Sequence, residues 1–380
     1  MVIMNIVICG DICPTTNNYK EFINEQSDVL FGKTKDFITN ADFAIANLEC
    51  PLIDNGTPIF KSGPSLKAPS KSIATIKQVG FDAVSIANNH IMDYGEEGLN
   101  NTVRLCNDFS LLTVGAGLNS LEAAKPLYYE KNNVKVGIIS YTDNEFGVST
   151  LTEAGSNGLD LLYSFDNISN IKNKCDYLII LYHSGTEHYP YPSPQLQCRC
   201  RKMVESGANL VVCQHSHCIG TIETYDNSTI IYGQGNFLFS RNNKSKKWNT
   251  GIIIELELDE FKNGTLRYLP TIIDEIGVDF ATESEKEEVL IQIRNRSNEV
   301  ANTNVLHKYW IQYCNNISTT YWSFLLGHSK LKRIFNKVFK NIAIRINYNN
   351  NKALLTHNII RCESHREILE TMLSSYYRKR

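Results

Sequence analysis

Residues 3–13 read Ile-Met-Asn-Ile-Val-Ile-Cys-Gly-Asp-Ile-Cys, a short apolar run that leads into Gly10-Asp11. An apolar run of this length, bounded by a turn residue, predicts a buried β-strand over residues 3–9. The carboxylate of Asp11 then follows the end of that strand. Taken alone, Gly-Asp after a strand is more often a simple turn than a functional site.

The same arrangement recurs four more times in the first 240 residues. Each run predicts a strand, and each is followed directly by amide, carboxylate or imidazole side chains. The runs and their polar successors are Phe43–Ala46 before Asn47-Leu48-Glu49, Ala83–Ile86 before Ala87-Asn88-Asn89-His90, Tyr177–Tyr182 before His183-Ser184-Gly185-Thr186-Glu187, and Leu210–Cys213 before Gln214-His215-Ser216-His217.

Helical patterns lie between these runs, and a sixth strand is expected over Val134–Tyr141. The expected helices are Ser70–Val79, Glu96–Asp108, Phe165–Lys174 and Gln195–Glu205. This alternation predicts an α/β core with helices packed on a sheet. Sites in such folds form at the carboxyl ends of the strands, so the five polar stretches are expected to converge.

The residue types in these stretches predict a metal site. The candidate ligands are Asp11, Glu49, Asn89, His183, His215 and His217. Mixed oxygen and nitrogen donors suit Mn, Fe or Zn, and six donors suit two divalent ions that share a carboxylate. Alternation along an extended segment would place both imidazoles of the His-x-His pair on one side. Each signal has a structural alternative, such as a helix cap for the asparagine or a core histidine for His183.

Together these residues resemble the CapA family of poly-γ-glutamate capsule biosynthesis proteins, within the calcineurin-like metallophosphoesterase superfamily. Further matching stretches are Pro51-Leu52, Asp93-Tyr94-Gly95 and Tyr232-Gly233-Gln234-Gly235-Asn236-Phe237-Leu238-Phe239. The resemblance covers roughly residues 1–275 and leaves out the tail. It implies a four-layer α/β/β/α metallophosphoesterase-like sandwich with a metal centre between the strand ends.

The resemblance also implies a role for each candidate. Asp11 and His217 would hold one ion, and Glu49 would bridge both. Asn89, His183 and His215 would hold the second ion. His90 would face the substrate as a catalytic residue that protonates a leaving group or stabilises developing charge.

The sequence departs from the superfamily pattern in several places. Cys13 stands where the general motif has a histidine, so it is either a thiolate ligand or a sign of a weak first metal position. Glu49 replaces the usual aspartate, and Gln214 and Ser216 replace a glycine and a proline near the His-x-His pair. Glu187 is a second catalytic candidate, as a general base, a partner of a histidine or a group that binds the cation of an amine substrate, with a plain surface residue as its alternative.

Composition limits the remaining classes of protein. The 380 residues carry a net charge of −2 and are 42% hydrophobic, which excludes a disordered chain. No apolar run approaches the roughly 20 residues that cross a bilayer, and the N-terminus has no signal-peptide pattern. Eleven scattered cysteines argue against a disulfide framework. We therefore expect a cytoplasmic protein, or one peripheral to the membrane.

The tail differs from the body in charge. Residues 301–380 contain 13 basic and 3 acidic residues, whereas residues 1–300 contain 25 and 37. We expect residues 1–280 to form the CapA-like domain and residues 281–380 a helical, basic extension, starting with a surface helix over Glu283–Val300. Residues 330–346 predict a basic amphipathic helix that either contacts a membrane surface or packs on the protein or a dimer mate. A nucleic-acid role is disfavoured, and the oligomeric state is left open.

Three functional hypotheses remain. The first is a metal-dependent hydrolase of a phosphoester or amide bond linked to capsule, poly-γ-glutamate or peptide metabolism. The second is a metal-assisted acid/base enzyme, similar to a peptide epimerase. The third is a non-enzymatic protein that binds or exports an anionic polymer. The expected partner is accordingly a small molecule, a peptide or an anionic polymer.

Overall fold

The computed structural model describes residues 2–241, 245–300, 302–339, 342, 344 and 349–377. The chain forms two compact units, Met1–His307 and Lys308–Arg380.

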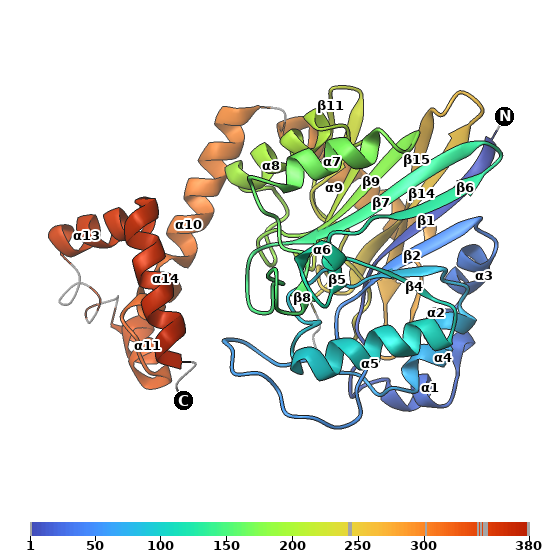
Figure 1. The fold of residues 1–380 in the computed structure, drawn as a ribbon. Helices are drawn as coiled ribbons and strands as arrows, with labels where there is room; N and C mark the ends of the chain where they lie inside the picture. Colours follow the sequence, from blue (N-terminus) through green and yellow to red (C-terminus); the bar gives the residue numbers. More distant parts are fainter. Residues whose placement is uncertain are drawn as a thin grey trace. The chain divides into compact units, whose positions relative to one another are not determined.

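Two large β-sheets form the centre of the first unit (Figure 1). One sheet has the order β16-β15-β14-β1-β2-β3-β4, with β13 paired to β1. Its strands are β1 (Val2–Ile12), β2 (Phe43–Leu48), β3 (Ala83–Ser85), β4 (Leu112–Val114), β13 (Asn236–Leu238), β14 (Thr250–Asp259), β15 (Gly264–Ile273) and β16 (Val278–Phe280).

The second sheet has the order β11-β12-β10-β9-β7-β6. Its strands are β6 (Leu127–Lys131), β7 (Val134–Thr142), β9 (Tyr177–His183), β10 (Leu210–Gln214), β11 (Ile222–Tyr225) and β12 (Ser228–Ile231). A small separate pair joins β5 (Ala116–Gly117) to β8 (Gly155–Ser156).

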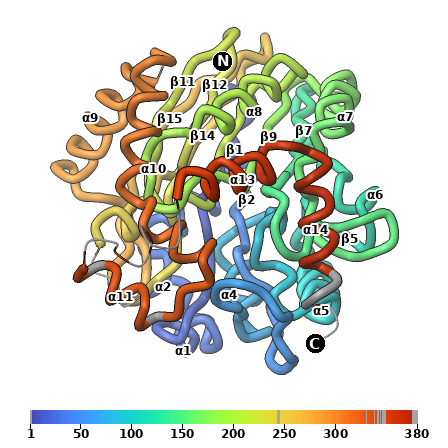
Figure 2. The backbone as a smooth tube through the Cα atoms, turned by 90° about the vertical axis from the view of Figure 1, so that its left-hand side faces the viewer, coloured from blue at the N-terminus to red at the C-terminus, as the bar shows by residue number. Residues whose placement is uncertain are grey.

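Helices cover the outer face of each sheet. Figure 2 shows the strands between α7 and α8 on one side and α1, α4 and α5 on the other. The helices of this unit are α1 (Tyr19–Ile23), α2 (Ser27–Phe31), α3 (Thr34–Thr39), α4 (Ser72–Gln78), α5 (Gly95–Asp108), α6 (Ser120–Ala123), α7 (Ser164–Lys172), α8 (Pro194–Glu205) and α9 (Glu283–Val300).

Alternating side chains divide the core into layers. Along β9, Ile179 and Leu181 belong to the cluster between the sheets, whereas Leu178 and Ile180 face the helical layer of α7 and α8. A third cluster packs the first sheet against α1–α5. Because successive side chains of a strand point to opposite faces, a strand buried on both faces is apolar throughout. The predicted four-layer α/β/β/α sandwich is confirmed.

The first unit extends beyond the boundary expected at residue 280. Helix α9 contacts β15 and β11, and its Val289 and Ile293 are buried in the cluster between the sheets. Val300 is also buried, in the cluster beneath α7 and α8. The helix at residues 283–300 therefore belongs to the first unit rather than to the C-terminal extension.

The second unit is helical. Its helices are α10 (Thr303–Leu325), which begins before the unit boundary, α11 (Lys330–Val338), α13 (Asn350–Arg361) and α14 (Glu363–Tyr377). The amphipathic helix expected over 330–346 forms α11 as far as Val338, and Ile346 lies outside the described residues. Within the described parts of the chain, no helix is both long and apolar enough to cross a membrane.

Candidate metal centre

The carboxyl ends of strands from both sheets bring the candidate ligands together. β1, β2 and β3 are parallel neighbours in one sheet, and β9 and β10 are parallel neighbours in the other. Parallel strands end at the same edge, so the residues that follow them gather there. The ligand candidates at these ends are Asp11, Glu49, Asn89, His183, His215 and His217.

Three donor atoms lie around Nε2 of His183. Its Nε2 atom lies 3.1 Å from Asn89 Oδ1, 3.2 Å from His215 Nδ1 and 3.7 Å from Glu49 Oε1. Ligand atoms that each lie about 2.0–2.2 Å from one ion are separated from each other by roughly 3–3.5 Å. These spacings are close to that range, and the group matches the set expected for one of the two ions.

A second donor group shares Glu49 with the first. His217 Nε2 lies 3.7 Å from Glu49 Oε1, and His217 Nδ1 lies 3.6 Å from Asp11 Oδ2. Glu49, His215 and His217 each offer a ligand atom within 4.8 Å of the others. Glu49 Oε1 therefore lies near a histidine of each donor group.

The buried carboxylates match the chemistry of a cation site. Asp11 Oδ2 and both carboxylate oxygens of Glu49 are buried, with no hydrogen-bond donor among the described residues. Buried polar atoms without a partner are rare in folded proteins, and two adjacent carboxylates repel each other. A divalent cation would satisfy all three oxygens, so these residues fit the metal ions that the sequence implied.

Burial shifts the titration of Glu49, His183 and His215 toward their neutral forms. It raises the pKa of Glu49 well above its usual value, and the neighbouring Asp11 carboxylate adds to this effect. Burial lowers the pKa of His183 well below its usual value, and burial together with His217 lowers the pKa of His215 to about 4. The imidazoles are therefore neutral near pH 7 and have lone pairs available for a metal.

Hydrogen bonds from outside the donor set fix the histidine rings. Asn236 Nδ2 donates to the carbonyl of Trp248 at 2.9 Å, so its Oδ1 accepts from His217 Nδ1 at 2.8 Å. The indole of Trp248 packs on the same imidazole, with ring centroids 4.4 Å apart. His217 Nε2 is thereby left facing Glu49, as a metal ligand requires.

A chain of amides orients the other side of the centre. Asn88 Nδ2 donates to Asn47 Oδ1 at 3.1 Å, which turns the Asn47 amide nitrogen toward the ligands. Asn47 Nδ2 then donates to Asp11 Oδ1 at 2.8 Å and lies 3.3 Å from His183 Nδ1. One carboxylate and one imidazole from different sheets are held by a single side chain.

The His-x-His pair does not lie on an extended segment, so that expectation is wrong. Residues 215–218 form bends, with φ of +83° at His215 and +49° at His217. Positive φ is uncommon for residues other than glycine and recurs at functional sites, where surrounding contacts maintain it. The imidazoles still meet, with centroids 6.0 Å apart, because the backbone turns rather than because side chains alternate.

Gln214, which departs from the expected glycine, links the two sheets beneath the donors. Its Nε2 donates to Gln234 Oε1 at 3.0 Å. Gln234 Nε2 in turn donates to the carbonyl of Ile8 at 2.8 Å and to that of Ile252 at 3.0 Å. β10 is thus tied to β1 and β14 just below the ligands.

His90 lies beside the donors with a partner on one ring nitrogen. Asp93 Oδ2 lies 2.7 Å from His90 Nδ1, and the other Asp93 oxygen forms an ion pair with Lys61. The Lys61 ammonium also lies 3.3 Å from His90 Nδ1 and donates to the Asn89 carbonyl. Burial lowers the pKa of His90, whereas Asp93 raises it. The imidazole is held by its Nδ1 side, which leaves Nε2 for another contact.

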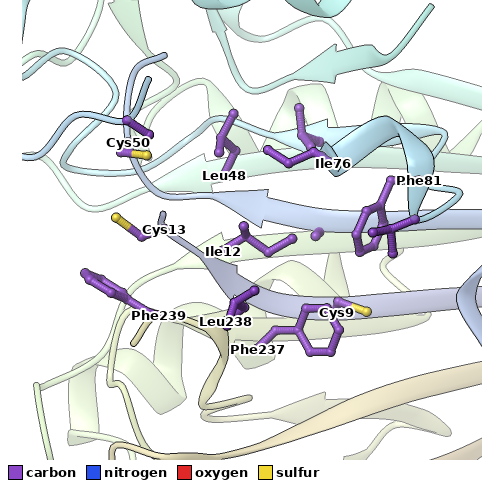
Figure 3. Packing of buried hydrophobic residues seen from close by; sticks show 14 of the residues in the cluster. Cys9, Ile12, Cys13, Leu48, Cys50, Ile76, Phe81, Phe237, Leu238 and Phe239 are labelled. Atoms are coloured by element: carbon purple, nitrogen blue, oxygen red, sulfur yellow. The ribbon is translucent and has the colours of Figure 1, made fainter. Parts of the chain in front are cut away.

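Cys13 is not among the three residues whose ligand atoms lie within 4.8 Å of one another. Its side chain is buried in the apolar cluster beneath the first sheet, and Figure 3 shows it with Cys50 and Phe239. Burial and the adjacent Cys50 thiol raise the pKa of Cys13 well above its usual value. The Cys13 thiol also adds to the raised pKa of Glu49, so it lies near the bridging candidate, and its role as a ligand stays a prediction.

Glu187 lies at the rim of the centre rather than inside it. Its side chain is exposed, and its negative charge raises the pKa of both His215 and Glu145. This position fits a group that meets solvent or substrate. The catalytic role predicted for Glu187 stays a prediction.

Sequence reasoning missed several residues that support the site. Asn236 was visible, because it stands in the stretch Tyr232–Phe239 that carried the family resemblance. Asn47 stands in the stretch Asn47-Leu48-Glu49, from which only Glu49 was predicted as a ligand. Lys61 and Trp248 lie in segments without strand or helix periodicity, so no local signal could have identified them.

The two sheets, their helical cover and the carboxylate, amide and imidazole donors at shared strand ends define a metallophosphoesterase-like α/β/β/α protein. A family model described as "Bacterial capsule synthesis protein PGA_cap" matches residues 5–241. The chain belongs to this family of bacterial capsule synthesis proteins, and the resemblance to CapA is confirmed.

The individual relatives have low sequence identity to this chain. The capsule biosynthesis protein CapA of Bacillus anthracis is 27% identical over 248 residues, which are 63% of this chain and 60% of that protein. The PGA biosynthesis protein CapA of Bacillus subtilis (strain 168) is 27% identical over 281 residues, 72% of each chain. This chain therefore spans about three fifths of the first relative. Among solved structures, a putative 5'-nucleotidase from Staphylococcus aureus is 16% identical with a TM-score of 0.44, covering 77% of this chain and 58% of that one.

Proposed function

We propose that this protein is a metal-dependent hydrolase of a phosphoester or amide bond. The observation that carries the proposal is the cluster of buried, unpaired carboxylate oxygens of Asp11 and Glu49 facing neutral imidazoles. Asp11, Glu49 and His217 would hold one divalent ion. Glu49, Asn89, His183 and His215 would hold the second.

Divalent ions in such a site supply Lewis acidity that activates water and stabilises negative charge on a phosphoryl or acyl oxygen. The protein's own contribution centres on His90. Asp93 holds its Nδ1 edge, so a proton on Nε2 can be delivered to a leaving group. Positioned acid–base groups of this kind contribute roughly 10²–10⁴-fold to rate. Lys61 and Asp93 act on His90 as positioning residues.

The substrate belongs to the chemistry of capsule or poly-γ-glutamate synthesis in this proposal. Support comes from the family description and from the names of the two Bacillus relatives. The exposed Arg241 adds a physical reason, because its guanidinium stacks on Phe239 at 4.5 Å and on Trp248 at 4.3 Å, next to His217. A stacked guanidinium is suited to hold a carboxylate or phosphate of an anionic substrate.

The two alternatives use the same donors differently. An epimerase-like enzyme would use His90 or Glu187 to move a proton at a peptide carbon. A non-enzymatic protein would only bind or export an anionic polymer. The oriented, buried group of His90, Asp93 and Lys61 supports an enzyme over simple binding, because polymer binding has no need of a held imidazole.

The test combines metal content with turnover. Wild type, His215→Ala and His90→Gln are purified without chelator and examined by elemental mass spectrometry, then assayed on phosphoester and amide substrates. We expect about two equivalents of Mn, Fe or Zn in wild type and in His90→Gln, and fewer in His215→Ala. Hydrolysis is expected in wild type alone.

Each other result decides against a specific part of the proposal. Absence of metal even after reloading would overturn the metallohydrolase. Full metal content without turnover of either substrate class would favour polymer binding. Release of no product, but incorporation of solvent deuterium at a peptide Cα, would favour the epimerase-like enzyme.

A further inference from the structure

We propose that the C-terminal unit attaches the protein to an anionic lipid surface through one face of α11. The contact residues are Leu331, Ile334, Phe335 and Val338, which we call the apolar face of α11. This inference goes beyond the proposed hydrolase function and does not depend on it.

The apolar face of α11 points away from the interior of its own unit. Its four side chains are 79%, 55%, 45% and 67% exposed, in chain order. Their spacing of three, four and seven residues places them on one side of the helix. The opposite side holds Asn336, which is fully buried with its Nδ2 3.1 Å from His328 Nδ1.

This orientation reverses the usual arrangement of an amphipathic helix on a protein surface, where apolar residues face inward and amides face water. A buried amide opposite four exposed apolar side chains is the arrangement expected when the outer medium is itself apolar. In the described part of the second unit, the apolar face of α11 is therefore exposed to the surroundings. Contact of this face with water is unfavourable.

Neighbouring side chains enlarge the same kind of surface. Phe339 and Ile342, which follow α11, are 48% and 46% exposed. At the end of α10, Phe324 and Leu325 are 56% and 55% exposed, and the Arg333 guanidinium lies 5.4 Å from the Phe324 ring. The C-terminal end of α10 therefore lies close to the first turn of α11.

The positive charge of the second unit favours an anionic surface as the partner of the apolar face of α11. No acidic residue occurs between Glu299 and Glu363, and the unit Lys308–Arg380 has a net charge of +10. Lys332 and Arg333 are exposed on α11, Lys332 at the flank of its apolar face and Arg333 on the side away from it. Basic residues flanking an apolar helical face bind acidic lipid headgroups while the apolar side chains enter the interface. A second copy of this unit would bring like charges together, which disfavours a dimer through the same face.

The helix would lie on the membrane rather than cross it. The nine residues of α11 span about 13 Å, less than half of the roughly 30 Å hydrocarbon core of a bilayer. An interfacial helix needs only to bury one face at the level of the headgroups.

The test is flotation of the full-length protein with phosphatidylcholine vesicles that contain or lack phosphatidylglycerol, at low and high salt. Binding is expected to depend on the apolar face and on the positive charge of α11, and one double variant tests each. Leu331→Glu with Phe335→Glu changes the apolar face, and Lys332→Gln with Arg333→Gln removes positive charge. Matched controls are Leu151→Glu with Leu162→Glu, which are 77% and 76% exposed in the first unit, and Lys20→Gln with Lys71→Gln, also exposed there.

We expect wild type and both control variants to float with phosphatidylglycerol vesicles at low salt and to be released at high salt. The apolar-face variant should lose at least tenfold in partitioning. The charge variant should lose about fivefold for each charge removed. The far-UV circular dichroism spectrum should be the same in all variants, which shows that they are folded.

Several outcomes would overturn the proposal. Equal partitioning of the apolar-face variant and wild type would mean that α11 does not enter the interface. A wild-type dimer that fails to float, and becomes monomeric in the apolar-face variant, would assign the face to a second copy. A monomer that fails to float, but loses thermal stability in the apolar-face variant, would assign the face to packing on the protein itself.

Discussion

The Nδ1 atom of His217 lies 2.8 Å from Oδ1 of Asn236, and this contact decides which imidazole nitrogen is left for a metal. The amide cannot reverse without losing its own bond to the Trp248 carbonyl. A main-chain oxygen outside the donor set therefore controls the tautomer of a ligand through one asparagine. Partners of this kind raise the basicity of the histidine and reduce the cost of ordering it.

Replacement of Asn236 should weaken metal binding without removing a ligand. We expect Asn236→Ala to lower metal affinity about 10–100-fold, the usual effect of removing a hydrogen-bond partner of a metal-bound histidine. The measurement is competition of Zn²⁺ or Mn²⁺ with a chelating indicator. Asn100→Ala, at an exposed asparagine in α5, is the control and should bind metal like wild type. Equal affinity of Asn236→Ala and wild type would remove His217 Nε2 from the ligand set.

Glu49→Gln should separate metal binding from folding. Both oxygens of Glu49 are buried without a hydrogen-bond donor, and burial beside Asp11 raises the pKa of this carboxyl. The ionised carboxylate therefore lowers the stability of the folded protein when no metal is bound. We expect metal-free Glu49→Gln to be at least as stable to urea as metal-free wild type. It should also lose the rise in Tm that metal gives wild type, because both ions lose their shared ligand.

A second buried glutamate, Glu223, is the control for Glu49→Gln. Glu223 accepts a hydrogen bond from Tyr232 at 2.6 Å and is paired with Arg201. Glu223→Gln should lose about 1–3 kcal/mol of stability while keeping the metal-induced rise in Tm. Loss of stability in metal-free Glu49→Gln, similar to that of Glu223→Gln, would mean that Glu49 has a structural partner and would contradict the cation site.

The sequence indicated where the strands are, but not how far they continue. Gly10-Asp11 suggested that the first strand ends at Cys9, yet β1 continues to Ile12 and pairs with β13. A Cβ atom at Gly10 would lie 2.3 Å from the carbonyl oxygen of Gly235. The glycine is needed for this close approach of a distant segment, and not for a turn. Local composition carries no trace of a contact more than 200 residues away.

The unit boundary could have been predicted more closely. Val289, Ile293 and Val300 are buried, and their spacing of four and seven residues is a helical one. This weak pattern was obscured by the charged residues around it. The candidate ligands were found because each follows an apolar run. Lys61 was not found, because it comes from a long irregular segment whose position depends on Asp93.

Removal of Lys61 should change the titration of His90. The Lys61 ammonium is 3.3 Å from His90 Nδ1 and lowers the pKa of the imidazole, whereas Asp93 raises it. In Lys61→Met the repulsive charge is gone, and the Asp93 carboxylate keeps only His90 and the Leu66 N–H as partners, so the pKa of His90 should rise. NMR titration of the imidazole in metal-free protein measures this shift. Lys67→Met, which removes a lysine stacked on Tyr94, should leave it unchanged. A fall or no change in Lys61→Met would show that Lys61 does not act on His90.

The metal-free protein should lose stability on acidification, partly through His215. Burial lowers its pKa to about 4 in the folded chain, against an ordinary value of 6.5. The unfolded chain therefore binds more protons between these values. The contribution of His215 is fully present above pH 6.5 and is lost as pH falls through about 4. Full protonation would cost about 3 kcal/mol.

Urea unfolding of metal-free wild type and His215→Gln at pH 5 and pH 7 isolates this effect, because other groups titrate in both proteins. Glu49 in particular acts in the opposite direction: its raised pKa stabilises the fold at low pH, and that stability is lost as pH rises. Wild type should lose more stability than His215→Gln between pH 7 and pH 5. Bound metal should oppose this loss, because it competes with protons for the same nitrogen. Equal losses in the two proteins would mean that His215 is already solvated and free to protonate, which would contradict its place among the buried donors.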